Sequence, residues 1–393
     1  MKVKLNYVWL DGSTPEPRLR SKITIKEFFN ANHWPDIRNY PDCCFDGSST
    51  SQADSSSSDC NLKPVRVYYP KNVTELSTIY LLCEVLDKDN NPHPSNDRNK
   101  LGEEDKEFWV GFEQEYFIRS GRNKEILGFN RSGNLDPQGV YYCGVGGQMV
   151  GRSVSNEHMD KCLNHYIDIE GANAEVALGQ WEYRIFAKGK LKAADDLIMS
   201  RYFLYEIAER YGYDIELHPK PLTGDWNGSG LHTNFSTNRM RKTGGEQYFK
   251  AIFNSFEFRT KEHIENYGSN NELRLTGKHE TQSIDKFTWG ISDRGASIRV
   301  PKSVGETWKG YLEDRRPAAN ANPYKVIQVI TETLNVANQL ERTLHSMYDT
   351  KTADLTKASE TMNGLFKGIL SGDDLLNVYR DDDKEINSDL KNK

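Results

Sequence analysis

The sequence lacks several features that mark particular classes of protein. Its six cysteines include no C-x-x-C pair, and a chain of 393 residues does not need disulfides, so we expect free thiols. No apolar run is long enough to span a membrane, and the run from Tyr7 to Leu10 ends at Asp11, too early for a signal peptide. Positive charge is not in excess either: 51 Lys and Arg against 57 Asp and Glu give a net charge of -6. We therefore expect a cytoplasmic protein with neither a nucleic acid nor a membrane as partner.

The composition is that of an ordinary globular protein, with 36% hydrophobic and 27% charged residues. Short β elements are predicted in the first hundred residues, for example at Val3–Leu10, Val65–Tyr69 and Ile79–Leu86. The stretch from Asp87 to Asp105 is polar and contains Pro and Gly, which favours a domain boundary there. We predict an N-terminal domain over residues 1–103 and a second domain over 104–393, whose acidic tail begins at about 371.

Hydrophobic periodicity and turn residues predict the main elements of the second domain. Helical spacing predicts helices at about 156–167 and 195–211, and a third that begins at Pro323 after an Asn322 N-cap. A polar excursion is expected between Gly121 and Gly139, and the serines at 55–58 are expected to form a loop.

The strand predicted at Trp109–Arg119 separates two kinds of side chain. Val110, Phe112 and Gln114 alternate with Glu113 and Glu115, so a strand would place both carboxylates on one face. They would lie roughly 7 Å apart at the backbone, given the rise of a strand. Like charges at that separation repel, so the arrangement costs stability unless a cation lies beside the pair. One such pair alone favours a solvated outer face, but the acidic residues and the histidine found later in the chain favour a bound cation instead.

Further ligands for a cation recur later in the chain. A turn or bulge near Gly179 would bring Glu175 and Glu182 to one side of the sheet. His232 follows a Gly-rich loop, on a predicted strand whose same face carries Asn234 and Ser236. Several carboxylates with one imidazole suit a hard divalent cation such as Mg²⁺ or Mn²⁺.

Arginines occur in three later stretches of the predicted second domain. Arg274, Arg294 and Arg299 precede a stretch in which Glu313 and Arg315 share one face of a predicted strand. Arginine grips carboxylates and phosphates with two parallel hydrogen bonds, whereas for Arg316 we expect a surface salt bridge. A metal cluster of carboxylates beside arginines is typical of phosphoryl transfer.

Taken in order, these stretches resemble glutamine synthetase, and specifically its eukaryotic-like class II. The matching segments are Phe45–Thr50, Gly111–Tyr116, Asn173–Val176, Gly179–Tyr183, Asn227–Ser236, Arg274–Thr281, Asp293–Pro301 and Glu313–Pro317. The resemblance implies an α+β fold: a small N-terminal β-grasp domain, then a larger catalytic domain with a curved antiparallel sheet flanked by helices. It also implies ATP-dependent ligation of ammonia to the γ-carboxylate of L-glutamate through γ-glutamyl phosphate, which yields glutamine, ADP and phosphate in nitrogen assimilation.

The resemblance also implies roles for individual residues. Two or more cations are expected, one held by Glu115, Glu175 and Glu182, and another by Glu113, His232 and Glu313. Glutamate is expected to contact Asn227, Gly228, Arg274, Arg294 and Arg315. ATP is expected to contact Trp109, Glu113, Asn234, Phe235, Ser236, Arg294, Arg299 and Tyr311. Asp46 would take a proton from ammonium, Glu280 would lie on a flap over the intermediate, and Arg294 and Arg315 would complete the catalytic set. The family implies a decamer of two pentameric rings, in which the Asp46 loop completes a neighbour's site.

The sequence departs from the family at a few positions. Cys43 and Cys44 replace the usual Trp-Asn, Asp225 replaces Asn, and the Gly121–Gly139 excursion is longer than is typical. None of these changes removes a catalytic residue. Two other hypotheses remain at this stage: a γ-glutamyl ligase that uses an amine, against which Asp46 argues, and an inactive relative, against which the six candidate metal ligands argue.

Overall fold

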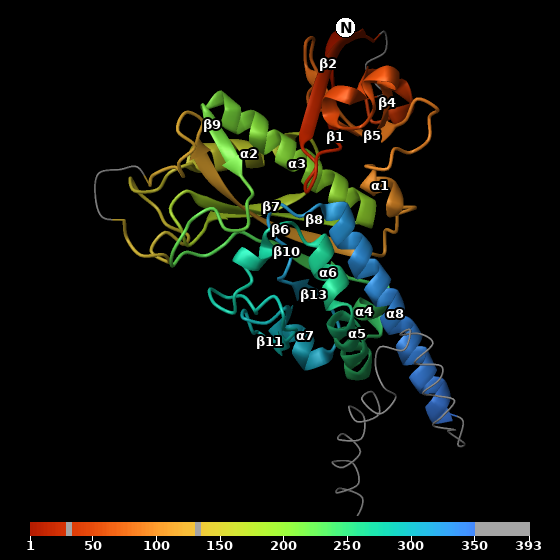
Figure 1. Cartoon of the computed structure of the whole chain (residues 1–393), viewed down its shortest axis with the longest axis vertical. Coiled ribbons are helices and arrows are strands. Elements are labelled where there is room, and N and C mark those ends of the chain that lie inside the picture. Colours follow the sequence, from red (N-terminus) through yellow and green to blue (C-terminus); the bar gives the residue numbers. More distant parts are fainter. Residues whose placement is uncertain (29–33, 130–134, 350–393) are drawn as a thin grey trace, which may run out of the picture.

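The computed structural model describes residues 1–28, 34–129 and 135–349, so the acidic tail lies outside the described residues. The chain forms an α+β fold with two sheets, as expected (Figure 1). The first sheet has the strand order β2-β1-β5-β4-β3, in which only the β1–β5 pair is parallel. Its strands are β1 (Lys2–Leu10), β2 (Leu19–Glu27), β3 (Cys43–Asp46), β4 (Asp59–Tyr68) and β5 (Thr78–Leu86).

The second sheet carries the residues singled out in the sequence. Its order is β11-β12-β13-β10-β6-β8-β7, with β9 also paired to β6. Neighbouring strands are antiparallel except for the parallel pair of β11 and β12. The strands are β6 (Trp109–Ser120), β7 (Ile169–Ala174), β8 (Gln180–Lys188), β9 (Tyr213–Glu216), β10 (Leu231–Ser236), β11 (Trp289–Ile291), β12 (Ile298–Val300) and β13 (Leu312–Asp314).

Helices cover the second sheet and join it to the first (Figure 1). The α-helices are α1 (Asp97–Lys100), α2 (Arg152–Asn164), α3 (Lys190–Arg210), α4 (Asn238–Lys242), α5 (Glu246–Phe258), α6 (Thr260–Asn266), α7 (Lys302–Thr307) and α8 (Pro323–Asp349). Short 3-10 helices are η1 (Ile37–Asn39), η2 (Gly47–Thr50), η3 (Ser55–Ser57) and η4 (Asn271–Leu273). In the described ranges, no helix is both long and apolar enough to cross a membrane.

The predicted helices exist, but two of them begin earlier than their apolar spacing indicated. α2 begins at Arg152 after Gly151, and α3 begins at Lys190 after Gly189. Both glycines have positive φ angles, 84° and 129°, which a side chain disfavours. α8 begins at Pro323 as predicted, and the backbone N–H of Tyr324 donates to the Asn322 side chain over 3.1 Å.

A buried carboxylate on α3 ties the two sheets together. Asp195 is fully buried and accepts hydrogen bonds from Arg66 Nε at 2.7 Å, Arg98 Nε at 2.8 Å and the Tyr324 hydroxyl at 2.8 Å. These donors come from β4, α1 and α8, so one carboxylate on α3 joins the first sheet, the segment that follows it and the last described helix. Because the carboxylate of Asp195 is fully buried while its arginine partners are 28% and 15% exposed, loss of these partners would leave a buried charge unpaired, and the contact fixes α3 in place.

Candidate active site

β6 separates its side chains between two faces, as the sequence predicted. Val110, Phe112 and Gln114 are at most 1% exposed and face the helices. Glu113 and Glu115 point the other way, and the register places Glu113 opposite His232 on β10 and Glu115 opposite Glu182 on β8. Directly opposed residues on neighbouring strands lie close enough for their side chains to interact. The central strand therefore brings both carboxylates next to further candidate ligands.

The ligand atoms form two overlapping groups. One comprises Glu113, His232 and Glu313 and the other Glu115, Glu182 and His232, and within each group the atoms lie within 4.8 Å of one another. His232 belongs to both: its Nδ1 is 3.5 Å from Glu113 and 3.8 Å from Glu313, and its Nε2 is 3.8 Å from Glu115. Carboxylates and one imidazole at these separations are a donor set that fits a hard divalent cation.

Glu175 lines the cavity into which these ligands point, but it belongs to neither compact group. Its carboxylate accepts hydrogen bonds from Asn173 Nδ2 at 2.9 Å and from the Val176 backbone N–H at 3.2 Å. The turn between β7 and β8 brings it to the side of Glu182, as the glycine predicted. Gly179 has φ of 78° and a Cβ there would lie 2.7 Å from the Leu127 carbonyl oxygen, so this turn requires glycine.

The electrostatic environment differs across the cavity. Burial, together with the charges of Glu113 and Glu115, raises the pKa of Glu182 to about 9. Burial and the charge of Glu115 raise the pKa of Glu175 to about 8. Burial would also raise the pKa of Glu113, but hydrogen bonds from His232 and Asn234 and the charge of Arg315 outweigh it and lower the pKa to about 2.

Arginines from three segments surround the Glu313 side of the cavity. Arg299 pairs with one oxygen of Glu313, and Arg315 Nη1 donates to the other over 2.6 Å. Arg274 is buried, which lowers its pKa to about 10, and its Nη2 lies 3.2 Å from His232 Nε2. Arg294 is exposed at the rim, and its carbonyl oxygen accepts from Arg315 Nε at 2.9 Å. The site is thus lined by acidic side chains and, around Glu313, by arginines.

The prediction of a surface salt bridge at Arg316 is wrong. Arg316 is only 3% exposed and forms a buried pair with Asp314, with Nη2–Oδ2 at 2.7 Å and Nε–Oδ1 at 2.9 Å. Its guanidinium also lies 5.3 Å from the ring centroids of Tyr267 and Phe287. Adjacent residues of the chain alternate in direction here, so Arg315 faces the cavity while Arg316 faces the core.

A cavity of about 670 Å³ brings most of the candidate site residues together. All six candidate metal ligands line it, together with Asn227, Gly228, Arg274, Glu280, Arg294, Arg299, Tyr311 and Arg315. Asn227 Oδ1 is buried and, among the described residues, has no hydrogen-bond partner. Glu280 stands at the edge with 59% of its side chain exposed, 3.9 Å from Arg315 Nη2.

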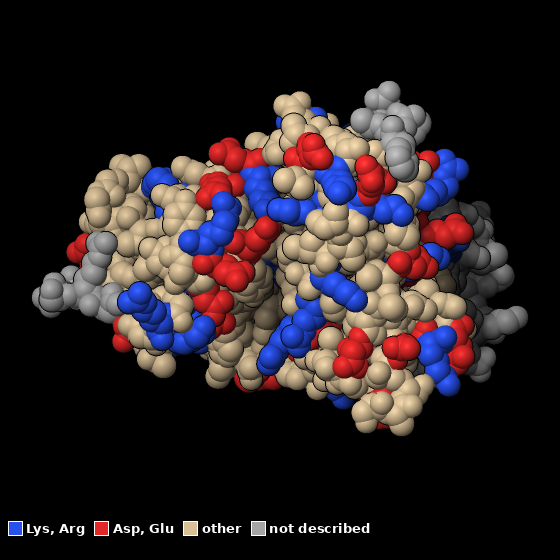
Figure 2. Space-filling model, turned by 90° about the horizontal axis from the view of Figure 1, so that it is seen from above, with Lys and Arg blue, Asp and Glu red and all other residues tan. Residues whose placement is uncertain are grey.

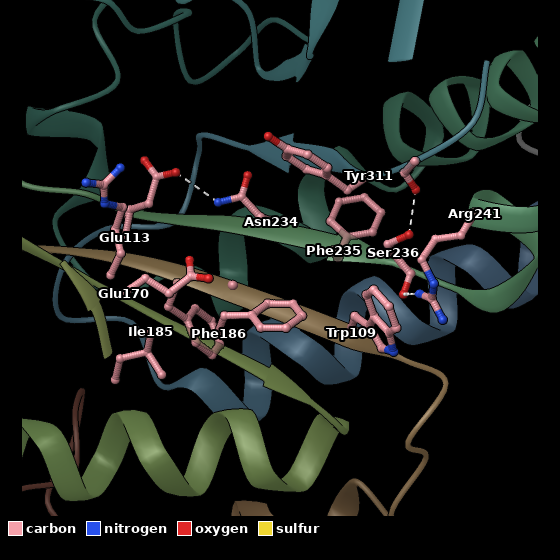
Figure 3. Close-up of a pocket in the computed structure, with 14 residues that line it drawn as sticks. Trp109, Glu113, Glu170, Ile185, Phe186, Asn234, Phe235, Ser236, Arg241 and Tyr311 are labelled. Carbon is pink, nitrogen blue, oxygen red and sulfur yellow. Dashed lines mark hydrogen bonds between the residues drawn. The ribbon is translucent and has the colours of Figure 1, made fainter. Parts of the chain in front are cut away.

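A second cavity of about 370 Å³ adjoins the first through Glu113 and Tyr311 (Figure 3). Trp109, Asn234, Phe235, Ser236 and Tyr311 all line it, as expected for one binding slot. Arg241, which sequence reasoning missed, holds its guanidinium 3.7 Å from the Trp109 ring centroid. Arg184 and Phe186 were also missed, although their period-two spacing from Glu182 on β8 was a usable signal.

Asp46 is the one predicted site residue that lines neither of these cavities. It lies at the end of β3 in the first sheet, where it is exposed and caps η2. Its carboxylate accepts from the Ser48 N–H at 3.0 Å and the Ser49 hydroxyl at 2.9 Å, and hydrogen bonds from Ser48 and Ser49 lower its pKa. Asp46 is thus an ordered carboxylate presented at the surface of the chain.

The two joined cavities define a class of enzyme. One holds a donor set for divalent cations beside arginines, and the other is a slot lined by aromatic side chains, which together suit metal-dependent phosphoryl transfer from a nucleotide. On the face seen in Figure 2, acidic and basic side chains are interspersed rather than segregated.

Comparison with known proteins identifies the family. The profile described as "Glutamine synthetase, catalytic domain" matches residues 96–250. Glutamine synthetase of Bradyrhizobium diazoefficiens is 50% identical over 341 residues, which cover 85% of this chain and 96% of the relative. That of Saccharomyces cerevisiae is 42% identical over 340 residues, which cover 85% and 89%. A glutamine synthetase structure from Plasmodium falciparum has a TM-score of 0.66 at 16% identity and covers 85% of this chain and 72% of that one, which supports the fold.

The chain belongs to the glutamine synthetase family, and eukaryotic members are among its relatives, which confirms the resemblance read from the sequence. It is an ATP-dependent ligase that joins ammonia to L-glutamate through γ-glutamyl phosphate and so makes glutamine. The enzyme uses ATP and a divalent metal, and the carboxylate and histidine groups of the cavity fit that requirement.

Proposed function

We propose that the first cavity holds two or more ions of Mg²⁺ or Mn²⁺ in two positions. Glu113, His232 and Glu313 would hold one, and Glu115, Glu175 and Glu182 the other. The observation that carries this assignment is the position of β6 between β10 and β8, which puts Glu113 opposite His232 and Glu115 opposite Glu182. When bound, the cations neutralise charge on the ATP phosphates during transfer of the γ-phosphoryl group.

We assign the remaining residues of the first cavity to glutamate and to the transferred group. Asn227 has a buried Oδ1 without a hydrogen-bond partner among the described residues, and this atom can accept a hydrogen bond from the α-ammonium group of glutamate. Gly228 shares that loop, and the guanidinium groups of Arg274 and Arg315 can grip the carboxylates of glutamate. Arg294 and Arg299 approach the cavity from the β11–β13 side and suit the phosphates.

We assign the second cavity to the nucleotide. Its aromatic side chains offer flat apolar surfaces for a base, and the cavity opens toward the metal ligand Glu113. Asn234 joins the slot to the cation site, because its amide donates to Glu113 over 2.9 Å (Figure 3). Within the slot, the Ser236 hydroxyl donates to the Gly310 carbonyl oxygen over 2.5 Å. ATP bound there would extend its phosphates toward Arg299 and Arg294.

Two carboxylates complete the proposed reaction. Glu280 would lie over the acyl phosphate and exclude water, which otherwise hydrolyses it. Asp46 would take a proton from ammonium, which is not a nucleophile until it loses one. Because Asp46 lines neither cavity of its own chain, we propose that it serves the site of a neighbouring subunit, in a decamer of two pentameric rings.

A mixed oligomer tests the shared site. Asp46→Asn subunits lack the ammonium base and Glu113→Gln subunits lack a metal ligand, so each variant alone is expected to be nearly inactive. Co-expressed, some interfaces pair an intact Asp46 with an intact Glu113 and regain activity. Mixed rings that are confirmed by mass and still show no activity would place Asp46 in its own subunit's site.

Substrate omission tests the proposed reaction as a whole. Phosphate release from ATP is measured with glutamate and with ammonia left out in turn, and then with small amines in place of ammonia. We expect full turnover only with glutamate and ammonia together. A clear preference for an amine would indicate a γ-glutamyl-amine ligase instead.

We also propose domain limits and a location. The first sheet ends at Leu86 and the second begins at Trp109, which supports domains over residues 1–103 and 104–393. The six cysteines are all free thiols, which supports a cytoplasmic location.

A further inference from the structure

Three loops that are far apart in the sequence meet at the edge of the first cavity. Asn227 lies in the Gly-rich loop before β10, His279 lies in the lid loop beside Glu280, and Gln138 ends the excursion after β6. The backbone N–H of Asn227 donates to Gln138 Oε1 over 2.7 Å. Gln138 Nε2 lies 3.2 Å from His279 Nδ1, so one amide side chain contacts both other loops.

The hydrogen bonds of this cluster have a single consistent direction. Because Gln138 Oε1 accepts from Asn227, its Nε2 faces His279, and an amide nitrogen can only donate. His279 Nδ1 must then accept, which leaves the proton on Nε2. That Nε2 lies 3.1 Å from Asp225 Oδ1, an acceptor. The tautomer of His279 is thus set by a donor on one side and an acceptor on the other.

The lid loop has an unusual backbone where these contacts occur. His279 and Glu280 are consecutive non-glycine residues with left-handed φ angles of 54° and 59°. Each such residue costs roughly 1 kcal/mol or more, so the pair persists only if surrounding contacts favour it. An isolated β-bridge between Thr276 and Ser283 joins the two ends of the loop, so the bend is confined to the segment that carries Glu280.

We propose that Gln138 and His279 are positioning residues of the ligase reaction, which hold the Glu280 lid loop against the loop that carries Asn227. This inference rests on the proposed lid role of Glu280 and on the proposed contact of Asn227 with glutamate. The hydrogen bonds from Asn227 to Gln138 and from Gln138 to His279, which we call the relay, couple the two loops. When Asn227 is held in position, the relay favours the lid conformation in which Glu280 covers the acyl phosphate. Asp225 is 95% exposed, so the hydrogen bond that it accepts from His279 Nε2 adds little energy and serves mainly to fix the tautomer.

The relay is tested by measuring glutamine formed per ATP hydrolysed in the assembled enzyme. Gln138→Leu removes both hydrogen bonds, and we expect roughly a three- to tenfold lower ratio, with a raised KM for glutamate and unchanged nucleotide affinity. Gln282→Leu is the matched control, since Gln282 lies in the same loop and, within the described part of the chain, its side chain bonds Thr288 at 3.0 Å and its own neighbour Ser283 rather than Gln138 or Asn227. Its ratio is expected to stay at the wild-type value.

A second pair of variants, at His279, tests the relay even if Gln138→Leu destabilises the fold. His279→Asn keeps an acceptor near the position of Nδ1 and tolerates a left-handed φ, whereas His279→Leu does neither. If Gln138→Leu melts earlier than Gln282→Leu, the histidine pair decides. A higher ratio in His279→Asn than in His279→Leu supports the relay, and equal ratios overturn it.

Glu280→Ala separates failure of this inference from failure of the proposed lid. A low ratio in Glu280→Ala with wild-type ratios in Gln138→Leu and both His279 variants would overturn the relay and leave the lid intact. A wild-type ratio in Glu280→Ala would overturn the lid, and the relay with it.

Discussion

The two clusters of carboxylates in the site, one around Glu313 and one around Glu182, lie on one sheet, but their negative charge is neutralised in different ways. Glu313 is 1% exposed and has Arg299 and Arg315 against its two oxygens. Glu182 is almost as buried, at 8%, but the arginine paired with it, Arg184, is 3.9 Å away and 49% exposed. The chain supplies its own positive charge on the β13 side of the cavity. On the β8 side the charge must come from outside, which is what a bound metal ion provides.

Activity gives the largest effect with which to test this comparison. Glu115→Gln removes a charged proposed ligand from the side of the cavity where no arginine pairs closely with a carboxylate. We expect kcat to fall by roughly 10²–10³-fold or more, about 3–4 kcal/mol of transition-state stabilisation. Steady-state assays at saturating metal and ATP measure it. Glu306→Gln, at an exposed glutamate on α7, is the control and should keep wild-type activity.

The stability of the metal-free enzyme compares the two sides directly. Glu313→Gln leaves Arg299 and Arg315 without their buried partner, and we expect a loss of about 3 kcal/mol in the free energy of unfolding. Glu182→Gln instead replaces a buried carboxyl group that has no close cation and whose pKa is raised to about 9, so the group is protonated near neutral pH. The free energy of unfolding of this variant should therefore stay within about 0.5 kcal/mol of wild type or rise. Denaturant unfolding in the presence of a chelator measures both. Equal losses in the two variants would contradict the comparison.

Metal-dependent melting gives the smallest of these effects. A cation at about 100 times its Kd stabilises the native state by about 2.7 kcal/mol, so Mg²⁺ should raise the Tm of the wild-type enzyme by several degrees. Most of that shift should vanish in Glu182→Gln, because the carboxylates around Glu182 have no closely paired arginine and so gain most from a bound cation. Thermal scans at a fixed protein concentration test this, and a full shift in the variant would place the responsive site elsewhere.

The sequence predicted the parts of the site that local periodicity determines. The alternation along β6 defined the face of Glu113 and Glu115, and Gly179 marked the turn that brings Glu175 toward Glu182. These features depend on residues within one strand or one hairpin. Their geometry follows from the period of a strand and from the conformational freedom of glycine.

Features that depend on distant packing could not be read in this way. Arg316 was expected at the surface because nothing in its own segment indicates that rings from other segments surround it. Arg241 extends from α4 to the ring of Trp109 on β6, a contact between distant segments. Likewise, the separation of Glu175 from the compact ligand groups depends on its hydrogen bonds from Asn173 and Val176. The early start of α3 at Lys190 was missed because apolar spacing marks the buried face of a helix rather than its first turn.

Calorimetric titration of divalent cations tests the central claim most directly. With Mn²⁺ as the probe, the wild-type enzyme should show two tight sites. Glu115→Gln should lose or weaken one of them and Glu113→Gln the other, because β6 directs the two carboxylates into different ligand groups. Two tight sites that survive in both variants would show that the cations bind elsewhere and that the ligand assignment is wrong.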